Sequence, residues 1–193
     1  MTTNLLDGLN TAQKKAVEHV EGPLLIVAGP GSGKTRVIVH RVAYLVQVCG
    51  VAPRRICVVT FTNKAARELR ERLARLLGGR VAEQVTAGTF HALCSRILRQ
   101  DGDAIGLDKG FTIYDRDDQL GVLKKAFQRA GIEPKKFSPS AVLSAISGAK
   151  AQLQSVEAFR AKVGSYFDEV VLRAYEEYQI FLYANQAVDF DDL

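Results

Sequence analysis

One eight-residue segment constrains the fold more than any other part of the chain. Residues 28–35 read Ala-Gly-Pro-Gly-Ser-Gly-Lys-Thr, after the apolar run Leu24–Ala28 and before helical periodicity that continues to about Val48. Spaced glycines let consecutive backbone N–H groups turn toward one point, and the following helix directs its positive end there. A buried strand, a glycine-rich turn and a helix in this order predict a phosphate-binding loop in a parallel α/β sheet.

The alternative is a glycine turn without a ligand, but Gly-Lys-Thr at the end of a buried strand has no common structural purpose. Such a lysine contacts the β- and γ-phosphates, and such a threonine hydroxyl ligates Mg²⁺. Lys34 and Thr35 are therefore the catalytic candidates, with Thr35 as the metal ligand, and Ala28 stands where the general pattern has glycine. The loop residues expected to bind ATP are Ala28, Gly29, Pro30, Gly31, Ser32, Gly33, Lys34 and Thr35.

The alternation of apolar runs and helical periodicity continues to about residue 110. A second strand is expected over Ile56–Phe61 and a third over Gln84–Thr86. The helix between them begins near Thr62 and ends at Gly78-Gly79, and another follows the third strand. The apolar face of the first of these helices carries Ala66, Leu69, Leu73 and Leu76. That of the second carries Phe90, Leu93, Cys94, Ile97 and Leu98.

Past Gly110 the chain has only helical periodicity, from Asp115 to Asn185. This predicts a second, all-helical unit that ends in a long helix. The apolar residues in register on that helix, which we interpret as core rather than as a ligand platform, are Phe167, Val171, Tyr175, Tyr178 and Leu182.

The net charge of +5 is concentrated between Arg54 and Arg99, where ten basic residues face three acidic ones. Either a polyanionic partner or a solvated helix face explains this excess. No apolar run is long enough to span a membrane and the first residues lack a signal-peptide pattern, so a cytoplasmic location is expected. The cysteines, expected to be reduced core residues, are Cys49, Cys57 and Cys94.

Several segments together resemble the motifs of the UvrD/Rep/PcrA-type superfamily 1 helicases. These are residues 9–13 and the phosphate loop, then residues 60–69 and 86–91. Residues 111–115 through 189–193 resemble the helical insertion of the same family, so the resemblance covers essentially the whole chain. It implies a partial RecA-like P-loop NTPase sheet in an ATP-binding domain over residues 1–110, an all-helical insertion domain over 111–188, and the start of a return over 189–193.

By resemblance, the parent protein is an ATP-dependent 3′–5′ DNA helicase that uses ATP and Mg²⁺. Its implied partners are single-stranded DNA, junctions of single- and double-stranded DNA, and a second RecA-like domain of the same polypeptide. Gln13 matches a glutamine that reads the adenine edge, and Arg36 matches an arginine near the nucleotide. The residues that match the DNA-binding loops are Thr60, Phe61, Thr62, Asn63, Thr86, Gly88, Thr89 and His91.

Asp189, Asp191 and Asp192 could suggest a Walker B pair, but such acids follow a buried apolar strand. Here residues 183–186 precede them, which we interpret as a polar helix end. The family pattern places its acidic motif beyond Leu193, so the chain is expected to bind ATP and DNA without hydrolysing ATP efficiently. A non-catalytic nucleotide- and DNA-binding module and a P-loop kinase are the alternatives, and a kinase gives residues 60–69 no role.

Overall fold

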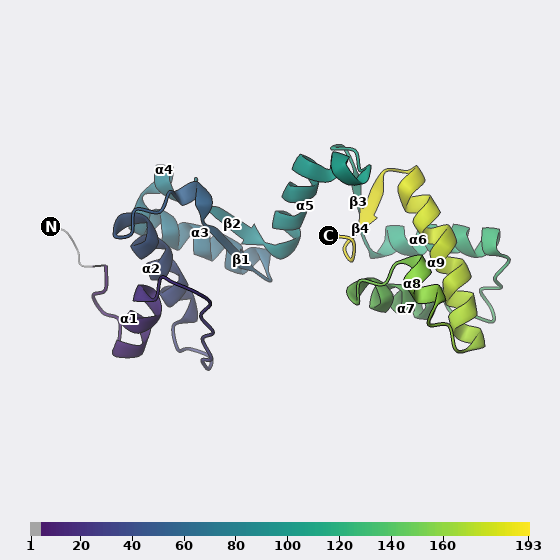
Figure 1. The fold of residues 1–193 in the computed structure, drawn as a ribbon, viewed down its shortest axis with the longest axis horizontal. Coiled ribbons are helices and arrows are strands. Elements are labelled where there is room, and N and C mark those ends of the chain that lie inside the picture. The colour runs from purple at the N-terminus through teal and green to yellow at the C-terminus, as the bar shows by residue number, and fades with distance from the viewer. Residues whose placement is uncertain (1–4) are drawn as a thin grey trace. The chain divides into compact units, whose positions relative to one another are not determined.

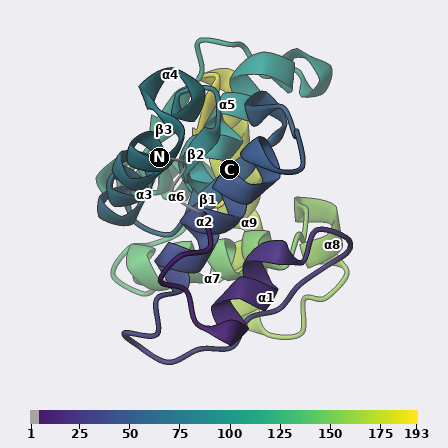
Figure 2. The ribbon, with the colours of Figure 1, turned by 90° about the vertical axis from the view of Figure 1, so that its left-hand side faces the viewer.

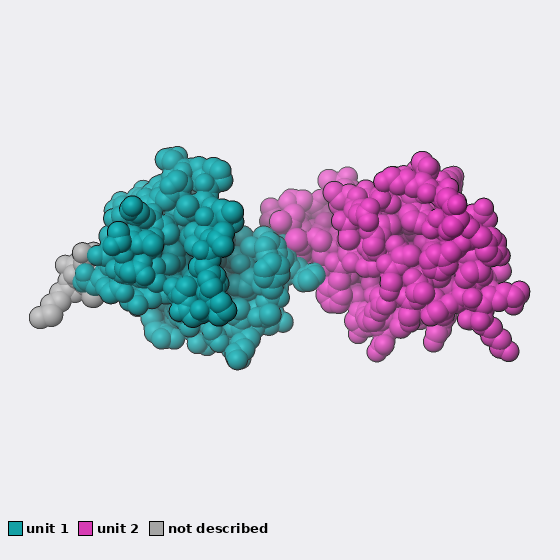
Figure 3. Space-filling model, turned by 90° about the horizontal axis from the view of Figure 1, so that it is seen from below, with its two compact units in different colours: residues 1–93 teal, residues 94–193 magenta. Residues whose placement is uncertain are grey.

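The computed structural model describes residues 5–193, and the chain divides into two compact units, 1–93 and 94–193 (Figure 3). Each unit has its own hydrophobic core. The change in sequence character near residue 110 therefore lies inside the second unit rather than at the boundary. Mixed helices and short parallel ladders agree with an α/β class, whereas a larger RecA-like sheet remains a prediction.

The first unit combines helices with one small parallel ladder (Figure 1). Its elements are α1 (Thr11–Glu18), α2 (Lys34–Gln47), a 3₁₀ turn (Pro53–Arg55), β1 (Cys57–Thr60), α3 (Asn63–Leu77), α4 (Gly79–Ala82), β2 (Thr86–Thr89) and the start of α5 (Phe90–Asp101). Helix α1 lies against α2, which in turn packs on α3 (Figure 2).

Helix α3 forms where the apolar periodicity predicts it. The Thr62 side chain caps it by accepting a hydrogen bond from the Ala65 N–H at 3.2 Å, and Gly78 ends it at φ 80°. Ala66, Leu69 and Leu73 are buried, as predicted. Strands β1 and β2 pair in parallel from Cys57 opposite Thr86 to Thr60 opposite Thr89. The predicted second strand is thus confirmed nearly in place, whereas the third lies further along the chain than Gln84–Thr86.

The predicted buried strand at Leu24–Ala28 is not formed. These residues have no regular secondary structure, and the side chains of Leu25 and Val27 are 87% and 90% exposed. A strand needs a ladder partner, and in the described part of the chain β1 pairs only with β2. The apolar composition of this run predicts a buried strand. Among residues 5–193, however, no strand pairs with it and no residues bury its side chains.

Two further expectations about burial are wrong. Helix α5 forms over the predicted residues, but none of its residues is buried, and Phe90 and Ile97 are exposed. The cysteines are free, yet Cys49 and Cys57 are exposed and Cys94 is only partly buried. Periodicity correctly predicted the helix, but burial also requires a packing partner that the described residues do not supply.

The second unit is mainly helical, as predicted. After the end of α5 and a 3₁₀ turn (Gly102–Ile105), it contains β3 (Thr112–Tyr114), α6 (Arg116–Ala130), α7 (Pro139–Ala151), α8 (Val156–Arg160), α9 (Tyr166–Ala184) and β4 (Ala187–Asp189). Capping boxes begin α6 at Asp115 and α9 at Ser165. Helices α6, α7 and α9 enclose the core, in which Tyr175 and Tyr178 are buried as predicted. The same prediction is wrong for Phe167, which is 39% exposed.

The chain ends in a ladder that the helical periodicity did not reveal. Strand β4 pairs in parallel with β3, with Thr112 opposite Ala187 and Tyr114 opposite Asp189. Residues 187–189 are all buried in the second unit. Among the described residues, no helix is long and apolar enough to cross a membrane.

Candidate functional site

The phosphate loop connects residue 28 to the first turn of α2, and two of its glycines adopt left-handed backbone conformations. Gly31 has φ 75°, and Gly33, the N-cap of α2, has φ 86°. A side chain at Gly33 would be strained by this backbone, and its Cβ would lie 3.0 Å from the Gln13 Nε2. Glycine at this position therefore allows both the turn and the close approach of α1.

Lys34 bonds to the loop that precedes it. Its Nζ donates to the carbonyl oxygens of Ala28 at 2.9 Å and Gly29 at 2.7 Å, and the Ser32 hydroxyl also donates to Gly29, at 2.7 Å. These bonds hold the ammonium group at the mouth of the loop. A phosphate bound there could accept from the third ammonium donor or replace a neutral carbonyl, and as an anion it would form the stronger hydrogen bond.

Gln13 connects α1 to the loop. Its Oε1 accepts from the Asn10 N–H at 3.0 Å, which completes a capping box, and its Nε2 donates to the Ser32 carbonyl at 3.0 Å. The same amide therefore fixes the start of α1 and one side of the loop. Reading an adenine edge would require Gln13 to exchange at least one of these bonds.

A cavity of about 200 Å³ lies beside these groups, and its lining includes Gln13, Ala28, Ser32 and Lys34. No acidic residue lines this cavity in the described part of the chain. Thr35 lies exposed in the first turn of α2. Arg36 lines a different cavity, of about 250 Å³, together with His40, Arg72 and Arg75.

An aromatic pair lies at the carboxyl edge of the β1–β2 ladder. Phe61 follows β1 and is 89% exposed, whereas Phe90 follows β2 and is 44% exposed. Their ring centroids are 5.3 Å apart, at 42° between the ring planes. Phe61 was predicted as a DNA-stacking residue, whereas Phe90 was placed on the apolar face of the following helix. Each strand ends in a threonine that is followed directly by a phenylalanine, Thr60-Phe61 and Thr89-Phe90. This repeated Thr-Phe pair is the sequence signal that could have placed Phe90 beside Phe61.

Threonine hydroxyls fix the loops around this pair. Thr60 Oγ1 donates to the Thr62 carbonyl at 3.1 Å, Thr62 caps α3, and the Thr89 Oγ1 accepts from the Ala92 N–H at 3.2 Å at the start of α5. The hydroxyls that accept these capping bonds keep a proton to donate. Helices α3 and α5 also begin at this edge, at Asn63 and Phe90. Helix N-termini attract anionic groups.

The predicted DNA-binding residues do not all share this edge. The ladder brings Gly88 and Thr89 beside Thr60, whereas Thr86 pairs with Cys57 at the opposite end. Thr89 is 8% exposed, so its hydroxyl acts mainly on its own backbone. His91 lies exposed in the first turn of α5, next to Phe90.

Basic side chains project from the exposed face of α3. This face carries Lys64, Arg67, Arg70, Arg72 and Arg75, all exposed. Only Arg72 has an acidic partner among the ion pairs of the described residues, at 3.9 Å from Glu68. An exposed cationic helix that begins at the aromatic edge suits a polyanion that crosses this edge.

The prediction that Asp189, Asp191 and Asp192 do not follow a buried strand is wrong for Asp189. Asp189 does end a buried strand, because Ala187–Asp189 form β4. Its carboxylate, however, bonds to Lys150 and Tyr178 in the second unit. This arrangement gives the aspartate a partner that the sequence argument did not consider.

Residues 9–193 match the family described as the UvrD/REP helicase N-terminal domain. The chain is 48% identical to the ATP-dependent DNA helicase PcrA of Bacillus subtilis over 193 residues, which is 100% of this chain and 26% of that protein. It is 48% identical to PcrA of Leuconostoc citreum over 189 residues, 98% of this chain and 25% of that protein.

A third relative, PcrA of Staphylococcus aureus strain Mu50, is 46% identical over 189 residues, 98% of this chain and 26% of that protein. The chain thus spans about a quarter of the length of the curated relatives it matches. The family match covers nearly every residue, including the phosphate loop and both strand-end loops. The chain therefore belongs to the family of UvrD/REP helicase N-terminal domains.

Proposed function

We propose that this chain is the portion of an ATP-dependent 3′–5′ DNA helicase that binds ATP and single-stranded DNA. The relatives carry the name ATP-dependent DNA helicase, and the polarity rests on the family resemblance. The observation that carries the proposal is the exposed Phe61–Phe90 pair at a strand edge, in the same unit as the phosphate loop. A second RecA-like domain of the same polypeptide and a cytoplasmic location belong to this proposal.

In the proposed nucleotide site, the left-handed glycines and the start of α2 receive the phosphates. Lys34 supplies the positive charge and Gln13 reads the adenine edge. The proposed contact of Arg36 with the nucleotide requires its side chain to turn away from the separate cavity that it lines. Thr35 supplies a hydroxyl to Mg²⁺, which would neutralise developing charge on the phosphates when bound. Thr35 is exposed and directly follows Lys34 in the first turn of α2, which suits this task.

In the proposed DNA site, bases stack on Phe61, and Phe90 supports its ring from the other strand end. The groups at this edge that we propose to contact phosphates come from Thr60, Thr62, Asn63, Gly88, Thr89 and His91. A contact from Thr86, at the other end of the ladder, would involve a separate part of the DNA. Stacking on an aromatic ring tolerates any base sequence, which suits a protein that moves along DNA. Junctions between single- and double-stranded DNA are the proposed substrates of the parent protein.

We expect Phe61→Ala to weaken the binding of single-stranded DNA by about 1–3 kcal/mol, the usual contribution of one stacking platform. The ring is 89% exposed, so the thermal stability of the first unit should change little. Fluorescence anisotropy with a labelled oligothymidine measures the affinity, and thermal melting monitors the fold. Tyr183→Ala, at a 72% exposed ring in the second unit, is the matched control.

A Phe61→Ala variant that melts much earlier but keeps the wild-type DNA affinity would identify the ring as a structural group. Equal losses of affinity from Tyr183→Ala would show that stacking is not located at the strand edge. We also expect Phe90→Ala to weaken DNA binding, because Phe90 supports the Phe61 ring at 5.3 Å.

A second prediction concerns salt. If the basic face of α3 contacts DNA phosphates, the logarithm of the affinity should fall linearly with the logarithm of the salt concentration. Each single-strand phosphate contact contributes a slope of about −0.7. Removing two charges by Lys64→Gln and Arg67→Gln should reduce the slope by about 1.4. A control on the exposed Lys136 of the second unit, Lys136→Gln, should leave the slope unchanged, and a flat dependence in the wild-type chain would contradict the proposed phosphate contacts.

The absence of acidic residues from the lining of the Lys34 cavity, in the described part of the chain, favours a second reading. On its own, the chain would be a binding module that holds ATP and DNA without turnover. Carboxylates that hold the metal and orient water would then come from other residues of the parent protein. Steady-state ATPase assays with and without DNA distinguish a binding module from an active ATPase.

A further inference from the structure

A buried lysine on α7 has no role in the proposed nucleotide or DNA site. Lys150 lies on the helix face that also buries Val142, Ile146 and Ala149, and its side chain is only 4% exposed. Burying an ammonium group is costly unless it is paired and hydrogen-bonded. This position therefore requires acceptors, and the structure provides them from the end of the chain.

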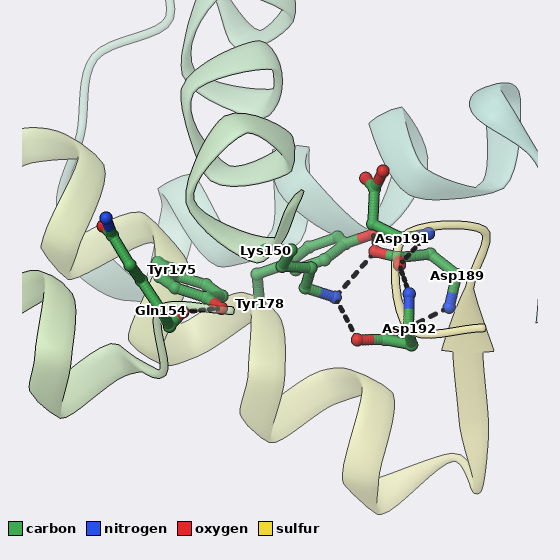
Figure 4. Close-up of polar contacts among 7 residues, drawn as sticks. All are labelled: Lys150, Gln154, Tyr175, Tyr178, Asp189, Asp191 and Asp192. Atoms are coloured by element: carbon green, nitrogen blue, oxygen red, sulfur yellow. Dashed lines mark hydrogen bonds and ion pairs between the residues drawn. The ribbon is translucent and has the colours of Figure 1, made fainter. Parts of the chain in front are cut away.

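Two carboxylates accept hydrogen bonds from the Lys150 ammonium group and form ion pairs with it (Figure 4). Its Nζ lies 2.8 Å from the Asp189 Oδ2 and 2.8 Å from the Asp192 Oδ1. The Tyr178 hydroxyl donates to the same Asp189 Oδ2 at 3.0 Å, and the Lys150 Nζ lies 5.3 Å from the centroid of the Tyr178 ring. Helices α7 and α9 thus supply the donors, and the last residue of β4 together with Asp192 supplies the acceptors.

The remaining oxygens of the same carboxylates close a turn in their own backbone. Asp189 Oδ1 accepts from the N–H groups of Asp191 and Asp192, both at 3.0 Å. Asp192 Oδ2 accepts from the Asp189 N–H at 3.0 Å. We call residues 189–192 the exit turn, because the chain turns there from the last residue of β4. Each carboxylate therefore bonds with one oxygen to Lys150 and with the other to the exit turn.

We propose that Lys150 is a positioning residue that fixes the conformation of the exit turn at the end of β4. Without the ammonium group, Asp189 and Asp192 would face each other and Tyr178 in a largely buried site. Their mutual repulsion would favour an open turn. The single lysine therefore decides whether these carboxylates close the turn or repel each other.

The charges around the exit turn are consistent with this role. Burial would raise the pKa of Asp189, but the ammonium of Lys150 and the hydroxyl of Tyr178 outweigh it and hold that pKa below its usual range. Burial raises the pKa of Asp192, since Lys150 offsets only part of the desolvation and the charge of Asp189 adds to it. Burial, with the nearby aspartates, also raises the pKa of Tyr178.

A cation site is the obvious alternative for these aspartates. The ammonium group, however, already occupies the position between the two carboxylates. The residues that the structure describes contain no group of three His, Cys, Asp or Glu side chains able to hold a metal ion. The proposed role of Lys150 also involves neither ATP nor DNA, so it does not depend on the proposed function.

The test is amide hydrogen exchange on the 193-residue chain at neutral pH. Lys150→Met keeps the length and apolar stem of the side chain but removes the charge, which leaves two buried carboxylates unpaired. We expect the protection factors of the Asp191 and Asp192 amides to fall by on the order of 10²-fold. Amides inside α6, such as those of Leu123 and Phe127, should lose much less. Lys136→Met, at an exposed ion pair with Glu133, should change these amides by less than about fivefold.

A second variant separates charge pairing from packing. We expect Lys150→Met combined with Asp189→Asn and Asp192→Asn to restore protection of the exit turn to within about tenfold of wild type, because no buried charge is left unpaired. Recovery would support the proposal even if Lys150→Met alone fails to fold. Loss of protection that is equal in the turn and in α6, or no recovery in the neutral triple variant, would overturn it and identify Lys150 as a general core residue.

Discussion

We expect the 193-residue chain to bind ATP but to hydrolyse it about 10³–10⁵-fold more slowly than full-length PcrA of Bacillus subtilis, even with DNA present. Phosphoryl transfer depends on a positioned water, a well-held Mg²⁺ and positive charge on the transferring group. Lys34 and the exposed hydroxyl of Thr35 supply only part of this set. No acidic side chain lines the cavity beside Lys34 in the described residues.

We also expect the chain to bind ATP weakly, because the site beside Lys34 is incomplete. The cavity beside Lys34 has a volume of only about 200 Å³, below the usual range for a site that encloses a nucleotide-sized ligand. A ligand held there stays largely in contact with water, which weakens each charged interaction. Two of the three ammonium donors of Lys34 already bond to the Ala28 and Gly29 carbonyls, so a phosphate competes with these carbonyls for all but one donor.

The measurement is steady-state ATPase activity of the purified chain with and without single-stranded DNA, beside Lys34→Ala and the control Lys14→Ala on α1. Nucleotide binding by calorimetry should disappear in Lys34→Ala and persist in Lys14→Ala. DNA-stimulated turnover in the wild-type chain, lost in Lys34→Ala, would show that the ligands for the metal and the water lie within these residues. The role of Lys150 would still be decided separately by hydrogen exchange.

Where local sequence determines an element by itself, the sequence predicted it well. Helix α3 combines an apolar face, the cap Thr62 and the terminating Gly78, and all three act as expected. The predicted long helix also forms, as α9, and buries Tyr175 and Tyr178, whereas its cap Ser165 was not predicted. The phosphate loop is equally local, because its two left-handed glycines lie where the motif requires them.

Features that depend on distant partners were not predicted. The apolar run at Leu24–Ala28 has the composition of a strand but forms no ladder in the described residues. The β3–β4 ladder joins segments about 75 residues apart, and three-residue strands leave almost no periodicity. Phe90 fits a helical face by spacing, and only the pairing of Thr60 with Thr89 reveals that it lies beside Phe61.

Lys150 shows that a sequence signal can exist without being interpreted. It follows Val142, Leu143, Ile146 and Ala149 on the apolar face of α7, where a charged residue is unexpected. A buried lysine requires an anionic partner, and the Asp-Phe-Asp-Asp segment at 189–192 is the densest acidic candidate that follows it. Periodicity identified the helix, but it gave no information on which distant carboxylates would pair with the lysine.

The second large effect concerns the core of the helical unit. Phe127 on α6 is fully buried, and it packs in the core that also contains Tyr175 and Tyr178. We expect Phe127→Ala to cost about 3–5 kcal/mol, because the substitution removes a buried ring and leaves a cavity that its neighbours fill only partly. The same change at Phe167 on α9, which is 39% exposed, should cost much less.

The loss from Phe127→Ala should be confined to the second unit, because the cores of the two units consist of separate sets of residues. The chain has no tryptophan, and five of its six tyrosines lie in residues 94–193, so tyrosine fluorescence reports mainly on the second unit. Its melting midpoint should fall by roughly 12 °C or more, while oligothymidine binding below that temperature should persist. Loss of DNA binding together with the fluorescence transition would instead show that the first unit cannot stay folded without the helical unit. The proposed DNA-binding edge at Phe61 would then depend on the core of the second unit, to which the first unit contributes no residue.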